Sequence, residues 1–121
     1  MVTPAGQEFA IDALDAPRGA RVLAVAGELD LYTAPQLRAA LDRELDRGVR
    51  ALVLDFNATT FMDSTALGVL ISALKALEPS GGRLVVATSR PSIVKTLAIT
   101  GLDRAVAVEP SRADAIDRIA S

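Results

Sequence analysis

The sequence contains no cysteine and no histidine, and these two absences exclude much of the side-chain chemistry that enzymes use. Without cysteine there is no disulfide, no thiolate zinc site and no cysteine nucleophile. Without histidine there is no imidazole metal ligand and no Ser-His-Asp triad. No glycine-rich phosphate-binding motif is present either. We therefore expect no enzyme activity, no cofactor and no bound metal ion.

The sequence is also poor in three other features: aromatic side chains, an excess of one charge and long apolar runs. Aromatic residues make up 3% of the chain, and 13 basic residues stand against 15 acidic residues, which gives a net charge of -2. Nucleic acid binding needs a basic patch or stacking platforms, and this composition supplies neither. The longest uncharged apolar stretch, residues 64–74, is shorter than the ~20 residues of a membrane span. Residues 1–10 show no signal peptide, so we expect a cytoplasmic protein without a membrane span or a nucleic acid partner.

The residues that are present describe a globular α/β protein. The chain has 121 residues, 50% of them hydrophobic, and this is enough for one domain with its own core. Apolar runs predict strands at residues 9–14, 21–26, 51–56, 83–88 and 105–108, of which the first two form an antiparallel hairpin. Helical spacing predicts four helices, at about residues 33–48, 64–77, 89–99 and 111–119. The strand-helix alternation from Arg21 onward predicts a mostly parallel, five-stranded mixed sheet flanked by these helices.

The first predicted helix has clear start signals and a charged outer face. Thr33 is expected to cap it and Pro35 to occupy its first turn. Its charged side chains are expected to form a solvated face, made up of Arg38, Asp42, Arg43, Glu44 and Arg47.

The segment 61–69, with the sequence Phe-Met-Asp-Ser-Thr-Ala-Leu-Gly-Val, is the richest in functional side chains. It places Ser64 at the start of a helix that follows a buried strand. Asp63, Ser64 and Thr65 are also ordinary helix-capping residues, and capping alone explains their spacing. A functional interpretation therefore needs a further observation.

The helix over residues 64–77 offers such an observation, because it lacks a charged outer face. Thr65, Val69, Ser72 and Ala76 form a second face of small or apolar side chains. Two interpretations remain open: a helix buried on two sides, or a docking face for a partner protein. Gly68 costs up to about 1 kcal/mol inside a helix and predicts the close approach of another backbone at either face.

Three aspartates follow predicted strands. We expect Asp30, Asp55 and Ser64 to lie around one edge of the sheet, because the carboxyl ends of parallel strands share an edge. A trio of Asp30, Asp55 and Asp63 there could bind Mg²⁺ or accept a phosphoryl group, which makes a phosphoacceptor receiver domain a competing hypothesis. A receiver domain has an acidic pair after its first parallel strand and a lysine near the end of its last strand. Here the first strand precedes a hairpin partner instead, and the two lysines, Lys75 and Lys95, lie in helical patterns.

Three segments together resemble the STAS domain family, most closely the bacterial anti-sigma factor antagonists. They are Gly27-Glu28-Leu29-Asp30, the helix start Thr33-Ala34-Pro35, and residues 61–69; the Gly81-Gly82 and Thr100-Gly101-Leu102 turns match as well. The resemblance implies a single STAS-like domain over residues 1–121, in which residues 1–8 are a candidate for disorder.

The resemblance also implies a function and its residues. In that family the serine that follows the aspartate is phosphorylated by a partner that is both an anti-sigma factor and an ATP-dependent serine kinase. Ser64 takes the acceptor position, with Asp30, Asp63 and Thr65 as its neighbours. The unphosphorylated form would bind the kinase and free the sigma factor, and a phosphatase would reset the switch.

One position departs from the family pattern. Ala66 replaces a glycine; this change leaves the fold intact and bears on the choice of partner. Together with residues of the second face of the same helix, the expected partner-binding residues are Ala66, Val69, Ser72 and Ala76. The alternative function is a constitutive STAS subunit of a lipid-transport or stress-signalling assembly. The intact Asp63-Ser64-Thr65 sequence favours the phosphorylated switch.

Overall fold

The computed structural model describes residues 8–120. The described residues form five strands and four α-helices: β1 (Ala10–Asp15), β2 (Arg21–Leu29), α1 (Ala34–Asp46), β3 (Ala51–Met62), α2 (Ser64–Leu77), β4 (Arg83–Ala87), α3 (Pro91–Thr100), β5 (Ala107–Glu109) and α4 (Arg112–Ile119). The expectation of disorder at residues 1–8 falls on a segment of which 1–7 lie outside the described residues, while Glu8 forms a β-bridge.

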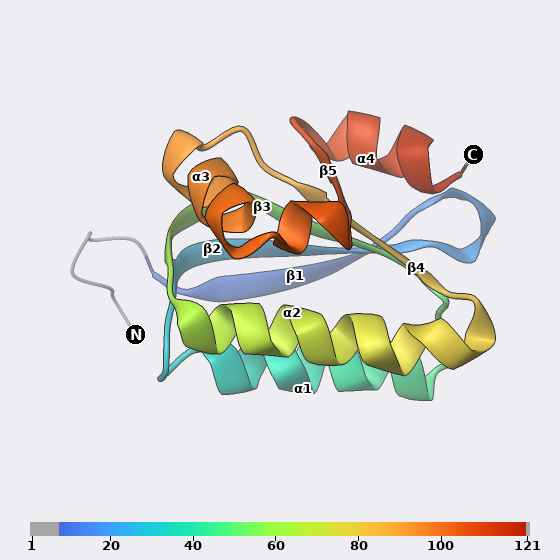
Figure 1. The fold of residues 1–121 in the computed structure, drawn as a ribbon. Helices are drawn as coiled ribbons and strands as arrows, with labels where there is room; N and C mark the ends of the chain where they lie inside the picture. The colour runs from blue at the N-terminus through green and yellow to red at the C-terminus, as the bar shows by residue number, and fades with distance from the viewer. Residues whose placement is uncertain (1–7, 121) are drawn as a thin grey trace.

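A single mixed sheet runs through the centre of the molecule (Figure 1). Its strand order is β1-β2-β3-β4-β5. β1 pairs with β2 in the antiparallel sense, and the pairs β2-β3, β3-β4 and β4-β5 are parallel. The N-terminal hairpin and the mostly parallel α/β sheet that the sequence predicts are therefore confirmed.

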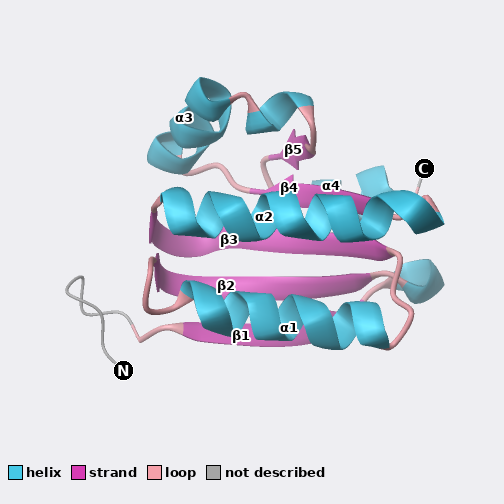
Figure 2. Cartoon of the chain, turned by 60° about the horizontal axis from the view of Figure 1, so that its bottom comes forward, coloured by secondary structure: helices cyan, strands magenta, loops and turns pink. Residues whose placement is uncertain are grey.

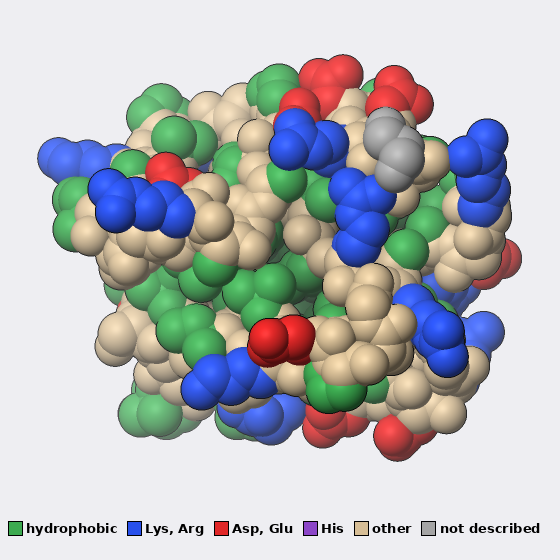
Figure 3. All heavy atoms as spheres, turned by 45° about the vertical axis from the view of Figure 1, so that its right-hand side comes forward, with side chains coloured by type: hydrophobic (Ala, Val, Ile, Leu, Met, Phe, Trp, Pro, Cys, Tyr) green, Lys and Arg blue, Asp and Glu red, His purple; other side chains and the backbone are tan. Residues whose placement is uncertain are grey.

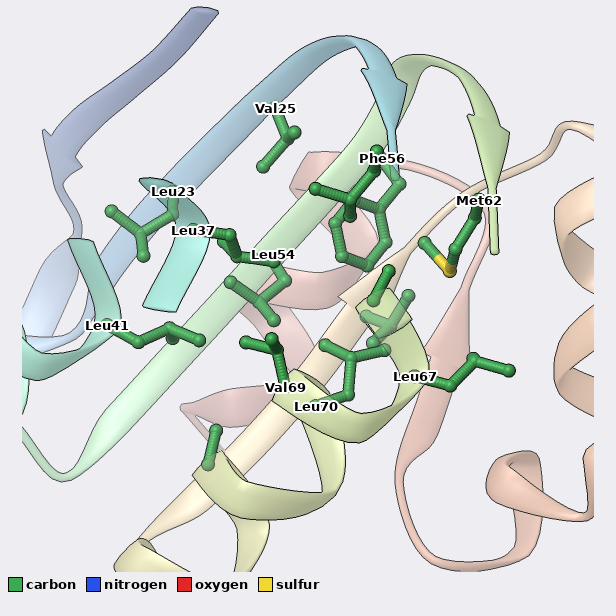
Figure 4. Packing of buried hydrophobic residues seen from close by; sticks show 14 of the residues in the cluster. Leu23, Val25, Leu37, Leu41, Leu54, Phe56, Met62, Leu67, Val69 and Leu70 are labelled. Atoms are coloured by element: carbon green, nitrogen blue, oxygen red, sulfur yellow. The ribbon is translucent and has the colours of Figure 1, made fainter. Parts of the chain in front are cut away.

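Helices cover both faces of this sheet. α1 and α2 lie side by side on one face (Figure 2), and α4 lies on the opposite face (Figure 1). Alternate residues of β3 divide between the two layers: Leu54 and Phe56 pack under α1 and α2, whereas Val53 packs under α4. Figure 4 shows the larger core, in which leucines of α1 and α2 meet the apolar side chains of β2 and β3.

β3 is longer than the sequence predicts. Residues 57–62, which lie beyond the strand predicted at 51–56, continue the strand and pair with β2, as in Ala26 with Ala58 and Leu29 with Met62. The pairing shifts register twice along this stretch, so two irregularities interrupt the alternation of buried and exposed residues. As a consequence the chain passes from the end of β3 almost directly into α2.

The prediction that Glu44 faces solvent on the outer side of α1 is wrong. Its side chain is buried, with only 3% of the residue exposed, and it accepts a 2.8 Å hydrogen bond from Nε of Arg21 at the start of β2. The hydrogen bonds to Glu44 and then to Asp15 raise the pKa of Arg21 above its ordinary value. Glu44 thus fastens the C-terminal half of α1 to the sheet rather than facing solvent.

The surface carries interspersed charges. On the face shown in Figure 3, basic and acidic side chains alternate with apolar ones, in keeping with the net charge of -2. Within residues 8–120, none of the helices has both the length and the apolar character that crossing a membrane requires.

Candidate functional site

Ser64 is the first residue of α2, and its side chain is exposed. Asp63 before it has an extended backbone and caps the helix. The Asp63 Oδ1 atom accepts hydrogen bonds from the backbone N–H groups of Thr65, at 2.9 Å, and of Ala66, at 3.2 Å. Two of the N–H groups that a helix start leaves without partners are thereby satisfied. The capping role that the sequence predicts for this segment falls to Asp63, which leaves the Ser64 hydroxyl free of that role.

The start of α2 is tied to the end of β2. The backbone N–H of Asp63 donates to the carbonyl oxygen of Leu29 at 3.1 Å, one step beyond the pairing of Leu29 with Met62. Asp30 directly follows Leu29. The structure therefore brings Asp30, Asp63 and Ser64 to the same edge of the sheet.

Asp30 organises the loop between β2 and α1. Its Oδ1 atom accepts hydrogen bonds from the backbone N–H groups of Tyr32, at 2.9 Å, and Thr33, at 3.0 Å. The hydroxyl of Thr33 donates to the carbonyl oxygen of Glu28 at 2.8 Å and accepts from the N–H of Asp30. Thr33 stands at the N-cap position of α1, as predicted, but its side chain makes no capping hydrogen bond, because its buried hydroxyl faces back into the loop.

This loop presents apolar side chains to solvent. Leu31 is 63% exposed and Tyr32 is 77% exposed. Phe61, three positions before Ser64 on β3, is also exposed. Exposed large apolar side chains that gather in one region are typical of protein interaction sites. Phe61 belongs to the segment 61–69 that the sequence points to, whereas Leu31 and Tyr32 were not predicted as functional residues, although they stand next to each other between Asp30 and Thr33.

A groove runs between α1 and α2 beside this loop. We call it the α1–α2 groove; its volume is about 470 Å³ and it is lined by Leu31, Ala34, Pro35, Arg38, Thr65, Gly68, Val69 and Ser72. Arg38 of α1 and Ser72 of α2 are joined across it by a 3.5 Å hydrogen bond. A smaller hollow of about 140 Å³ continues along the same helix pair, where Ala76 contributes to the lining.

The second face of α2 is only partly free. Val69 is 4% exposed and packs in the core shared with α1, while Thr65, Ser72 and Ala76 keep some exposure. Ala66 is 0% exposed. Its expected place on a partner-binding surface is therefore wrong, because the methyl group points into the core. The two interpretations, a helix buried on two sides and a docking face, are each correct for part of this face. One part is buried against α1, and the other part is accessible in the α1–α2 groove.

Gly68 leaves room for a side chain among the described residues. It is exposed, and a Cβ atom placed on it would meet nothing within 4 Å. The close backbone approach that its position in a helix predicts does not occur inside the domain. The packing of residues 8–120 therefore gives no reason for a glycine there.

Asp55 does not join the other two aspartates. It is buried on the α4 face of the sheet, where its Oδ2 accepts a 2.8 Å hydrogen bond from Nε of Arg112. Because β3 continues past Asp55 to Met62, the end of the strand lies well beyond it. In the part of the chain that the structure describes, no three carboxylates lie together in a way that could hold a metal ion. The expected grouping of Asp55 with Asp30 and Ser64 is wrong, and so is the acidic trio.

The sequence of the chain matches known proteins over most of its length. The model of the STAS domain family matches residues 13–115. The anti-sigma-B factor antagonist of Listeria monocytogenes is 35% identical over 86 residues, which cover 70% of this chain and 75% of that protein. The anti-sigma F factor antagonist of Paenibacillus polymyxa is 27% identical over 103 residues, covering 84% of this chain and 88% of that protein.

Solved structures agree with these matches. An anti-sigma factor antagonist from Mycobacterium paratuberculosis superimposes with a TM-score of 0.84 and 26% identity, covering all of both chains. The phosphorylated form of the Bacillus cell fate determinant SpoIIAA gives a TM-score of 0.72 and 26% identity, over 91% of this chain and 99% of that one. The chain belongs to the STAS domain family, and bacterial anti-sigma factor antagonists are among its relatives in sequence and in structure.

Proposed function

We propose that the chain is an anti-sigma factor antagonist that is switched by phosphorylation of Ser64. The unphosphorylated form binds an anti-sigma factor that is also an ATP-dependent serine kinase, and the sigma factor is released. The kinase then phosphorylates Ser64, and a phosphatase removes the phosphate. The chain itself acts in the cytoplasm as a binding protein rather than an enzyme.

The observation that carries the proposal is the position of Ser64. Its hydroxyl is exposed at the first residue of α2, inside an intact Asp63-Ser64-Thr65 sequence and beside the Asp30 turn. A kinase must bring the γ-phosphate of ATP to the attacking hydroxyl, so an exposed serine at the end of an element is suited to the reaction. Thr65 is less accessible, since it is half-buried and lines the α1–α2 groove.

The α1–α2 groove is the proposed partner surface. It borders Ser64 through Thr65 and Gly68, and through Leu31 it reaches the exposed loop that Asp30 organises. Gly68 lies four residues after Ser64 and therefore on the same face of α2. A glycine there costs stability without serving the domain, which supports close contact between the kinase and the backbone of α2 at this point. Ser72 and Ala76 extend the same surface along the helix.

Phosphorylation would disrupt that contact by charge and bulk rather than by refolding. A phosphate adds about -1.5 to -2 charge. The helix dipole favours this charge by roughly 0.3–1 kcal/mol, and Asp63 and Asp30 oppose it, so the free domain is left nearly unchanged. In a closed interface the phosphate loses its water beside apolar side chains such as Leu31, and this desolvation costs considerably more.

A constitutive role in a transporter or signalling assembly is the other function that the family offers. The STAS domain of a SulP transporter from Vibrio cholerae has a similar fold, with a TM-score of 0.65 at 19% identity over 86% of this chain and 83% of that one. That likeness concerns the fold alone. The intact serine sequence and the anti-sigma factor antagonists among the relatives support the switch.

The direct test is phosphorylation in a purified system. The protein is incubated with Mg-ATP and each serine-kinase anti-sigma factor of the organism that encodes it, and its intact mass is measured. We expect one phosphate with a cognate kinase and none in Ser64→Ala. Absence of modification with every such kinase, or an equal modification of Ser64→Ala, would contradict the proposal.

A further inference from the structure

The start of α2 already binds an anionic group of the chain itself. A helix N-terminus attracts phosphate because its first N–H groups lack partners within the helix. Here Oδ1 of Asp63 accepts hydrogen bonds from the N–H groups of Thr65, at 2.9 Å, and Ala66, at 3.2 Å. A phosphate carried by Ser64, at the first helical position, would compete with this carboxylate for the same donors.

From this competition we infer that Asp63 keeps the phosphate of phosphorylated Ser64 out of the helix N-terminus, so that the phosphate stays directed toward solvent. The inference rests on the proposed phosphorylation of Ser64 and makes Asp63 a positioning residue for it. Its role is to keep the modified group available to a phosphatase and to an approaching partner, instead of letting the domain bind the group internally.

The backbone favours the carboxylate in this competition. The N–H of Asp63 is held by the carbonyl oxygen of Leu29, and its own carbonyl oxygen accepts the N–H of Leu67. Both ends of the residue are therefore fixed, and its carboxylate is in place before any phosphate arrives. The Ser64 side chain is exposed, so its phosphate would have to give up rotational freedom to reach the same donors.

Charge acts in the same direction. Two carboxylates lie at this edge of the sheet: Asp63, which precedes Ser64, and Asp30, which directly follows the paired strand β2. Both repel a phosphate dianion that moves toward the helix start. Asp30 is held by the N–H groups of Tyr32 and Thr33, so it remains at this edge.

The test compares the phosphorylated domain with and without the Asp63 side chain. Phosphoserine is placed at position 64 by co-translational incorporation, so no kinase is required. The phosphate is titrated by ³¹P NMR in the wild-type background, in Asp63→Ala and in Asp63→Asn, and the amide signals of Thr65 and Ala66 are followed by ¹⁵N NMR. Asp63→Asn is the matched control, because it keeps the acceptor oxygen and removes only the charge.

In the wild-type background we expect the phosphate pKa to be no lower than in a short phosphoserine peptide, with the Ala66 amide insensitive to its titration. In Asp63→Ala the phosphate takes the vacant donors, so its pKa falls by about half a unit and the Ala66 amide titrates with it. The melting temperature then rises on phosphorylation in Asp63→Ala alone. A broad-specificity serine/threonine phosphatase is expected to dephosphorylate this variant several-fold more slowly. In Asp63→Asn the amide stays insensitive.

The inference is overturned if the Ala66 amide titrates with the phosphate in the wild-type background, or if Asp63→Ala and Asp63→Asn behave alike. Asp63→Gly repeats the comparison in case Asp63→Ala does not fold, since glycine is tolerated at a helix cap at small cost. A failure of every kinase to modify Ser64 would contradict the proposed function and would leave these NMR outcomes as they are.

Discussion

The backbone N–H of Asp63 donates a hydrogen bond to the carbonyl oxygen of Leu29, and this contact of 3.1 Å holds the start of α2 against the end of β2. It places Ser64 beside the loop that begins at Asp30. The proposed phosphorylation site is thus close to a loop that exposes the side chains of Leu31 and Tyr32, and Leu31 and Thr65 line the same groove.

Phosphate is expected on Ser64 and not on Thr65. The Thr65 side chain is half-buried at the α1–α2 groove, whereas Ser64 is exposed. Phosphopeptide mapping of the kinase-treated wild type, Ser64→Ala and Thr65→Ala decides between the two. Modification that persists in Ser64→Ala and disappears in Thr65→Ala would overturn the assignment.

Substitution of Gly68 is expected to separate stability from binding. Gly68→Ala should raise the free energy of unfolding by up to about 1 kcal/mol, because its Cβ enters open space and alanine favours the helix. Gly68→Leu should weaken kinase binding at least tenfold, because its side chain would fill the proposed contact surface. Denaturant unfolding and calorimetric titration measure the two effects.

Ala113→Leu is the matched control for Gly68→Leu. Ala113 is exposed on α4, on the opposite face of the sheet, and the same added bulk there should leave kinase binding unchanged. Wild-type affinity in Gly68→Leu would show that the partner does not approach this part of α2.

Asp30→Ala is expected to loosen the loop before α1. The N–H groups of Tyr32 and Thr33 lose their acceptor, so the free energy of unfolding should fall by about 1–2 kcal/mol. Asp30→Asn keeps an acceptor oxygen and should retain most of the stability. Urea denaturation measures this, with the exposed Asp12→Ala as the control. If Asp30→Ala were as stable as Asp12→Ala, the turn would not have the role assigned to Asp30.

Arg21→Ala is expected to destabilise the domain more than Arg43→Ala. The first change leaves the buried Glu44 carboxylate with only the 3.5 Å contact to Arg47, whereas Arg43 is exposed and its loss should cost within about 0.5 kcal/mol. Since the pKa of Arg21 is raised, its contribution is fully present below its ordinary pKa and is lost only above the raised one. Stability measured at neutral pH therefore contains the whole effect, and equal melting temperatures would contradict it.

The order of strands and helices could be predicted because it depends on local patterns. Asp63 and Ser64 signal the start of α2, and Pro91 and Gly101 mark the two ends of α3. Ser111, the first residue of the helix predicted at 111–119, caps α4 by accepting a hydrogen bond from the N–H of Asp114. Each of these signals lies within a few residues of the structure that it specifies.

The structural features that differ from the sequence predictions depend on contacts between distant parts of the chain. Residues 57–62 contain polar side chains and two register shifts, so only their pairing with β2 identifies them as strand. The burial of Glu44 requires Arg21, and that of Asp55 requires Arg112, which is 57 positions away. Sequence spacing carries no information about such partners.

The candidate functional region could be predicted only in part, for the same reason. The motif around Ser64 is local, and the structure places Asp30, Asp63 and Ser64 at one edge of the sheet. The direction of the Ala66 side chain and the α1–α2 groove follow from how α2 packs on the sheet and against α1. Helical periodicity predicted two apolar faces on α2. It did not show which residues of the second face are buried against the rest of the domain and which remain exposed.

Calorimetric titration of the cognate kinase is the decisive measurement for the proposed switch at Ser64. The titrated proteins are the unphosphorylated chain, the chain phosphorylated at Ser64, Ser64→Ala and Ser64→Glu, and the melting temperature of each is measured as well. We predict that the unphosphorylated chain and Ser64→Ala bind, and that the phosphorylated chain and Ser64→Glu do not, while all four melt at closely similar temperatures. Wild-type affinity in the phosphorylated chain, or loss of binding accompanied by global unfolding, would contradict the account.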